Sequence, residues 1–248
     1  DMQSLKKFYF WKQKAKVNTF IGGIGGTINT PALLASKLGI SEKRIKLFKV
    51  TGVDVECAVI GGGYIIPFNC FQSNTSITYY LDNDGLVLSI DSNGFRECAN
   101  LANVNFPKCT SISIGTGFFA FYRCVSLTSV SFPEVVHVGT QSFQECSLLT
   151  SINLPKVTKI GVFAFSTLPA INLINIPKCL YLGTNSLVNK PGNDNVFLNI
   201  KTGCTINTNI ALKTNNAGAP DGDLTYAKNT RSAIVNFYNN DGSYDSTL

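Results

Sequence analysis

The stretch SFQECSLLTSINLPKVTKIG, residues 142–161, decides the fold, because its spacing of residue types recurs along the chain. Counted from Phe143, a Cys follows after three residues, a Leu after six, an Ile after nine and a Pro after twelve. The same position recurs every 22 residues at Phe121, Phe165 and Leu187, whereas Phe95 lies 26 residues before Phe121. The chain therefore contains an internal repeat, and the unit that begins at Phe95 carries a four-residue insertion.

The repeat predicts a stacked architecture, because a unit this short cannot bury its apolar residues except against neighbouring units. Apolar and polar residues alternate in TSINLP, residues 150–155, which predicts one short strand per unit, ended by the Pro. Gly161, which follows the apolar Ile160, predicts a turn with positive φ. Strands of successive units are then expected to form a parallel sheet on one face of a solenoid.

Two stretches carry a resemblance to a known family: AFYRCVSLTSVSFPEVVHVGTQSF, residues 120–143, and SFQECSLLTSINLPKVTKIGVFAF, residues 142–165. They resemble the BspA-like leucine-rich repeats, and the resemblance covers about residues 71–198. It implies a β-rich, right-handed leucine-rich repeat solenoid with a parallel β-sheet face. It also implies surface adhesins or recognition modules of bacteria and some protists, or fibre-like proteins of phages, with no shared catalytic residues.

We expect three parts in the chain. Residues 1–66 form a basic N-terminal segment with two short helices and a strand, for capping or attachment. Residues 67–198 form the solenoid, and residues 199–248 form a β-rich C-terminal cap, since a solenoid needs a polar end. The first 50 residues hold 10 Lys or Arg against 2 Asp or Glu, so the net charge of +6 comes from the N-terminal segment. No apolar run is long enough to span a bilayer, so we expect no membrane span.

The cysteines are expected to be free, buried thiols, although eight of them invite a disulfide count. Cys98, Cys124 and Cys146 share one column of the repeat, and the next unit has Leu168 there. Because Leu replaces Cys, the column favours a small apolar residue over a bridge. Free thiols favour folding in a reducing compartment such as a bacterial cytoplasm, before any export or virion assembly.

The sequence does not predict an enzyme, a metal site or a cofactor. The single His137 has no second His with which to share a metal, and buried cysteines are poor nucleophiles. DNDG and DSNG, residues 82–85 and 91–94, lack the full pattern of a calcium loop and are interpreted as turns.

Residues 27–50 are predicted to be the clearly helical part, with Thr30 and Ser41 as helix caps. Segment 31–49 has a spacing typical of a helix-turn-helix, with Lys43 and Arg44 on its second helix. An intracellular DNA-binding regulator is therefore one alternative. The other interpretation is an N-terminal cap or attachment element, and it makes nucleic acid the less favoured partner. The alternating residues 47–60 predict a strand or hairpin.

The favoured function is a non-enzymatic recognition or structural module on a bacterial or phage surface, with a secreted host-protein-binding adhesin as a further alternative. The expected partners are a protein or glycan receptor and further copies of the chain in an oligomer or larger assembly. The strand face, expected to meet the receptor, comprises Asn103, Asn105, Ser129, Ser131, Ser151, Asn153, Lys156, Asn175 and Lys178. The candidate attachment residues are Phe8, Tyr9, Phe10, Trp11, Lys43 and Arg44. A merely solvated strand face would have the same composition.

Overall fold

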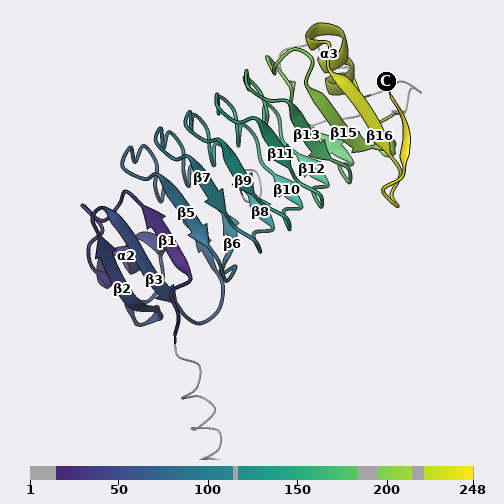
Figure 1. The fold of residues 1–248 in the computed structure, drawn as a ribbon. Coiled ribbons are helices and arrows are strands. Elements are labelled where there is room, and N and C mark those ends of the chain that lie inside the picture. The colour runs from purple at the N-terminus through teal and green to yellow at the C-terminus, as the bar shows by residue number, and fades with distance from the viewer. Residues whose placement is uncertain (1–14, 114–116, 184–194, 214–220, 248) are drawn as a thin grey trace, which may run out of the picture.

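The protein is a β-rich solenoid with a helix near each end (Figure 1). The computed structural model describes residues 15–113, 117–183, 195–213 and 221–247. Successive turns of chain stack along one axis, and their strands run parallel to one another (Figure 1). This confirms the predicted repeat solenoid with a parallel sheet on its face.

Each turn contributes two strands, where the repeat predicted one. One set lies on the front of Figure 1: β5 (Tyr79–Asp82), β7 (Asn103–Asn105), β9 (Ser129–Ser131), β11 (Ser151–Asn153), β13 (Leu173–Ile176) and β15 (Thr205–Asn209). The other set forms a second parallel sheet: β4 (Tyr64–Ile66), β6 (Val87–Ile90), β8 (Ser111–Ile112), β10 (His137–Val138), β12 (Lys159–Ile160) and β14 (Tyr181–Leu182). The second strand is only two residues long in most turns, too short to show an alternating pattern in the sequence.

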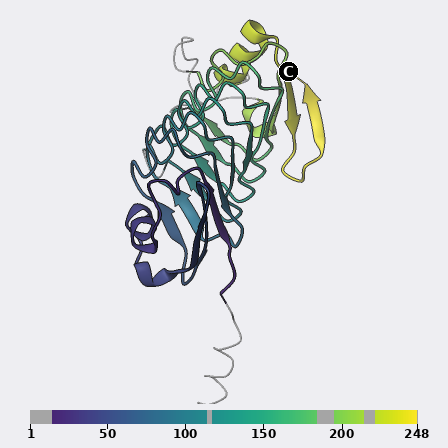
Figure 2. The same ribbon diagram turned by 60° about the vertical axis from the view of Figure 1, so that its left-hand side comes forward.

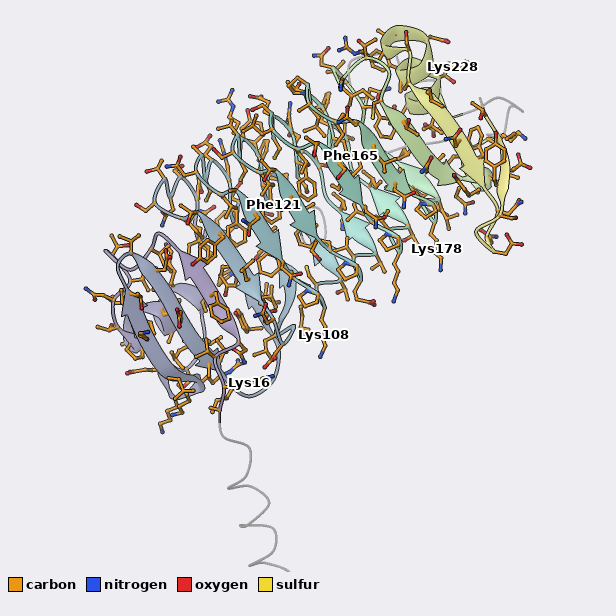
Figure 3. All side chains as sticks on the ribbon, in the orientation of Figure 1. Lys16, Lys108, Phe121, Phe165, Lys178 and Lys228 are labelled. Carbon is orange, nitrogen blue, oxygen red and sulfur yellow. The ribbon has the colours of Figure 1, made fainter. Side chains whose placement is uncertain are left out.

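The core is a column of stacked aromatic rings between the two sheets. Phe95, Phe121 and Phe143 are fully buried, with ring centroids 5.1 and 5.2 Å apart and nearly parallel planes. Phe71 precedes them, with its ring centroid 5.2 Å from that of Phe95, so the column begins one turn earlier. Figure 3 shows Phe121 and Phe165 inside the coil. Offset stacking adds to the burial energy of each ring, so the column holds neighbouring turns together.

The last turn begins at Phe197 rather than at Leu187. Phe197 is fully buried, its ring lies 6.3 Å from that of Phe165, and Leu173 pairs with Thr205 in register. Leu187 lies outside the described residues. The unit from Phe165 to Phe197 is 32 residues long, so the regular 22-residue spacing pointed to the wrong residue.

Gly161 does not adopt the positive φ that its position predicted. Among the glycines of this column only Gly183 does, with φ of 67°. A Cβ on Gly161 would lie 2.5 Å from the backbone nitrogen of Thr140 and 2.7 Å from the carbonyl carbon of Gly139. Gly is needed there because two turns approach too closely for a side chain.

The N-terminal residues extend the front sheet with antiparallel strands. The elements are β1 (Thr19–Gly22), α2 (Pro31–Leu38), the 3-10 turn η1 (Glu42–Arg44), β2 (Ile45–Thr51) and β3 (Asp54–Val59). The sheet order β2-β3-β1-β5 joins them to the first solenoid strand. Thr30 caps α2 by accepting the amide of Leu33, as predicted.

The helix-turn-helix prediction is wrong. Lys43 and Arg44 lie in the three-residue turn η1, and strand β2 follows it directly. The hairpin predicted over residues 47–60 is present and begins two residues earlier, at Ile45. The hairpin therefore contains the residues that a recognition helix would need. Ser41, predicted to cap that helix, makes no capping hydrogen bond with its side chain.

The C-terminal residues close the other end with two further strands and a helix that the sequence interpretation missed. The elements are the 3-10 turn η2 (Ile210–Leu212), α3 (Gly222–Arg231), β16 (Ile234–Tyr238) and β17 (Tyr244–Thr247). β16 continues the parallel sheet beside β15, and β17 turns back antiparallel along its edge (Figure 2). Asp221 caps α3 by accepting a hydrogen bond from the amide of Asp223. Among the described helices, none is long and apolar enough to cross a bilayer.

Candidate recognition surface

The predicted surface residues stand on the solvent side of the front strands. Asn103 pairs with Ser129 and Asn105 with Ser131, while Val104 between them is buried. This alternation places an uncharged amide or hydroxyl at every second position of each strand, facing water. Ser151, Asn153 and Asn175 stand in the same way on β11 and β13. Sequence reasoning therefore placed these side chains on the correct face.

The strand pairing of the front strands is interrupted between β9 and β11. Within the part of the chain that the structure describes, no strand pairing joins these two neighbours, and they belong to different sheets. Val130 on β9 is partly exposed, whereas Val104 and Ile152 at the equivalent positions are buried. The predicted face thus extends over two hydrogen-bonded sheets, with Ser129 on one and Ser151 on the other.

The sheet that begins with β11 carries a ladder of asparagine side chains. The amide of Asn175 donates to Asn153 at 2.7 Å, Asn207 donates to Asn175 at 3.2 Å, and Asn236 donates to Asn207 at 3.1 Å. Thr247 donates to Asn236 at 2.9 Å and ends the row. Each interior amide keeps one N–H and one oxygen lone pair for an external partner. The ladder holds the side chains in one orientation, which lowers the entropy lost on binding.

Asn207 and Asn236 were missed as members of this face. They stand in TINTN, residues 205–209, and AIVNF, residues 233–237, within the expected β-rich C-terminal cap. The alternation of Asn with buried Ile206 and Val235 was the available signal.

Lysines stand at the edge of the solenoid beside the front strands, and one of them forms an ion pair. Lys156 forms an ion pair with Glu134 of the preceding turn at 2.6 Å. Lys108 and Lys178 are exposed and project from the same edge of the solenoid (Figure 3). No ion pair involves either of them among the described residues. This edge therefore offers two separated positive charges rather than a continuous row.

Of the candidate attachment residues, only Lys43 and Arg44 lie among the residues that the structure describes. Phe8, Tyr9, Phe10 and Trp11 lie outside the described residues, so the attachment prediction for them is untested. Arg44 has a local role: its Nε donates to the carbonyl of Ile60 at 2.8 Å and its guanidinium also contacts the carbonyl of Gly62. Lys43 is exposed.

All eight cysteines are free and buried, as predicted. The thiols of Cys98, Cys124 and Cys146 donate to the carbonyls of Phe71, Phe95 and Phe121, each in the preceding turn, at 2.9, 3.0 and 3.2 Å. Burial raises the pKa of Cys98 to about 12, so the thiol stays protonated near neutral pH. A protonated, hydrogen-bonded thiol is a packing element rather than a nucleophile.

The described residues offer few other groups that could bind a metal or transfer a proton. No group of three or more His, Cys, Asp or Glu there could hold a metal ion. His137 is partly buried on β10, and burial together with the positive charge of Lys159 lowers its pKa. The front strands present hydrogen-bonding side chains to solvent, an arrangement that suits binding.

Comparison with known proteins agrees with this architecture. The family model of the BspA type leucine rich repeat region matches residues 64–192 in six copies. Among solved structures, a leucine-rich repeat protein from Bacteroides ovatus ATCC 8483 is 23% identical, with a TM-score of 0.35. The match covers 65% of this chain and 40% of that one, so this chain spans less than half of the Bacteroides protein. No curated protein matches the sequence. Because the family model covers more than half of the 248 residues, the protein belongs to the BspA type leucine-rich repeat family.

Proposed function

We propose that the protein is a non-enzymatic recognition module displayed on a bacterial or phage surface, where the front sheet contacts a polar receptor. Repeats of this family generally serve protein interaction rather than catalysis, and they are often surface-associated.

The observation that carries the proposal is the composition of the front sheet. The outward positions of β7, β9, β11 and β13 hold neutral amides and hydroxyls, such as Asn105, Ser131 and Asn175, with the apolar Leu173 as the exception. These four strands contain no charged residue. Neutral groups lose less hydration energy on burial than charges do, and the Asn ladder already holds several of them in place. Such a surface suits a polar partner, either a glycan or a hydrophilic protein.

Attachment is proposed to run through the N-terminal segment. It contains the apolar run at Phe8–Trp11, and its first 50 residues hold 10 Lys or Arg against 2 Asp or Glu. Apolar side chains on a basic segment favour self-association or docking on a larger assembly. Replacement of the four aromatic residues by Ser is then expected to convert an oligomer of the full chain to a monomer in light-scattering measurements.

The receptor contact is tested with a charge placed on the face. We expect the labelled full chain to bind members of an array of bacterial surface polysaccharides and extracellular-matrix proteins. Ser131→Arg should weaken that binding about tenfold, because it buries an unpaired charge in the contact. Thr230→Arg adds the same charge on the exposed side of α3 and should leave it unchanged. Equal binding by both variants, or no binding by the parent chain, would refute the proposal.

A further inference from the structure

The turns of Phe71, Phe95, Phe121, Phe143 and Phe165 each contain two residues with left-handed backbone, two positions before and two after the stacked Phe, and the turn of Phe197 contains only the second. The first position holds Asn69, Asn93, Phe119, Gln141 and Phe163; the second holds Ser73, Glu97, Arg123, Glu145, Thr167 and Asn199. Residues other than Gly adopt this conformation with strain, and Asn does so most readily. The two columns follow the second strand of each turn and lie away from the Asn and Ser positions of the front sheet.

Two turns depart from this polar pattern, because Phe119 and Phe163 occupy the first position. Phe119 has φ of 66°, a conformation in which a bulky side chain is a true outlier. Phe118, beside it, is 46% exposed although it is a large apolar residue. Phe118 and Phe119 stand at the end of the unit that begins at Phe95 and carries the four-residue insertion of the repeat. Insertions in repeat proteins gather on the binding face, and retained backbone strain marks functional positions.

Two arginines hold the aromatic rings in place. The guanidinium of Arg96 lies 5.0 Å from the ring centre of Phe119 and 5.6 Å from that of Tyr122. Arg123 lies 5.1 Å from the ring centre of Tyr122. The Phe118 and Phe119 rings meet edge to face at 5.1 Å, and those of Phe119 and Tyr122 at 4.9 Å. These cation–π and ring contacts fix a small aromatic platform at the surface.

Carboxylates balance the charge of the platform. Glu145 accepts from Nε of Arg123 at 2.8 Å and from the hydroxyl of Tyr122 at 3.3 Å. Glu97 pairs with Arg96 at 3.3 Å. Two arginines and two glutamates give no net charge, so the cluster does not select an acidic or a basic partner. Each ion pair still has donors and acceptors that its partner does not use.

We propose that this aromatic–arginine platform, formed by Arg96, Phe118, Phe119, Tyr122 and Arg123, binds a neutral carbohydrate. The C–H face of a pyranose ring packs on an aromatic face, whose π electrons are negative. Its hydroxyls reach the free donors and acceptors of the flanking Arg–Glu pairs. A platform already held by cation–π contacts loses little entropy when the sugar binds.

A peptide is the less suitable occupant because the local backbone is already used. The amide of Phe119 donates to Thr140 at 3.0 Å and that of Arg123 to Gln144 at 2.9 Å, both in the next turn. An extended peptide gains much of its affinity from main-chain hydrogen bonds of this kind. A sugar needs side-chain groups and a ring face, which the platform supplies.

The test uses the full chain and an array of neutral oligosaccharides built from glucose, galactose, mannose and their N-acetyl derivatives. We expect at least one neutral sugar to bind, and Phe118→Ala to weaken that binding about tenfold. Phe118→Trp should retain it, because it keeps an aromatic face. Val125→Ala removes an exposed apolar side chain from the same turn, 40% exposed, and should have no effect.

The front-sheet variant Ser131→Arg separates this site from the receptor contact proposed above, since it should leave binding of the neutral sugar unchanged. Circular dichroism establishes that each variant is folded before binding is compared. Absence of binding to every neutral sugar, binding only to peptides or acidic glycans, or equal affinity of Phe118→Ala and the parent chain would each overturn the assignment.

Discussion

Phe121 is the residue whose removal should most disturb the stacked turns. Its side chain is fully buried, between the parallel rings of Phe95 and Phe143 at 5.1 and 5.2 Å, with the edge of Phe132 at 5.8 Å. Truncation of a buried Phe to Ala costs about 3–5 kcal/mol. Loss of two stacked neighbours places Phe121→Ala toward the upper part of that range.

The consequence is large because a domain of ordinary stability has about 5–15 kcal/mol in total. Since turns contact only their neighbours, a break in the middle also weakens the coupling between the two ends of the solenoid. Urea unfolding of Phe121→Ala, followed by far-UV circular dichroism, should show a lower midpoint and a broader or two-step transition. Phe121→Leu keeps most of the volume and should lose only about 1.5 kcal/mol.

The matched control is Val125→Ala, an exposed apolar residue four positions away that should change stability by less than about 0.5 kcal/mol. A loss below about 1 kcal/mol for Phe121→Ala, or a loss equal to that of Val125→Ala, would refute the view that the ring column holds the turns together.

Three further predictions follow from the geometry. Gly161→Ala should destabilise the fold by about 1–3 kcal/mol, because its Cβ would lie 2.5 Å from the backbone of the preceding turn. Gly26→Ala should leave stability unchanged, because a Cβ there meets open space. The melting temperatures of the two variants compare them. The buried thiols should react slowly with a thiol reagent at about pH 8 and all eight should react in denaturant, since burial raises the pKa of Cys98 to about 12; fewer than about four reactive thiols in denaturant would contradict this. Burial and Lys159 lower the pKa of His137 below its ordinary 6.5, so the unfolded chain takes up the proton first and stability falls as the pH falls below about 6.5. His137→Gln should flatten stability between about pH 7 and 5.

The repeat was predictable because its apolar columns agree over several units. Phe121, Leu127 and Val130 recur at fixed offsets, and stacking is the physical answer to a unit that cannot bury its own apolar face. The second strand of each turn was not predictable, since two residues such as His137 and Val138 form it only by pairing with neighbouring turns. Strands that short have no periodicity of their own.

Elements outside the regular spacing were predicted less well. Phe197 occupies the Phe position after an interval of 32 residues, and Ile200 and Ile206 then follow at the expected three and nine positions. The helix-turn-helix spacing at residues 31–49 failed because tertiary pairing of β2 with β3 outweighed a local helical pattern. α3 has a weak helical sequence but a capping Asp221 and a packed Leu224.

The surface residues show the same division. Alternation on the strands placed Asn105 and Ser131 correctly, because side chains on a strand alternate by geometry alone. The missing strand pairing between β9 and β11, and the ladder from Asn153 to Asn236, depend on how neighbouring turns are aligned with one another. The platform at Phe119 depends on a left-handed backbone that the residue type argues against.

Deletion of one complete repeat tests the central claim, that each 22-residue unit is one turn stacked on the next. Removal of residues 143–164 should leave a folded chain with one cooperative thermal transition, because Phe165 then takes the place of Phe143 beside Phe121. Removal of only residues 143–153 shifts the strand register by half a turn and should give an unfolded or aggregated chain by circular dichroism and gel filtration. The stacked-turn account would be contradicted if both deletion variants were unfolded, or if the variant lacking residues 143–153 folded and the variant lacking residues 143–164 did not.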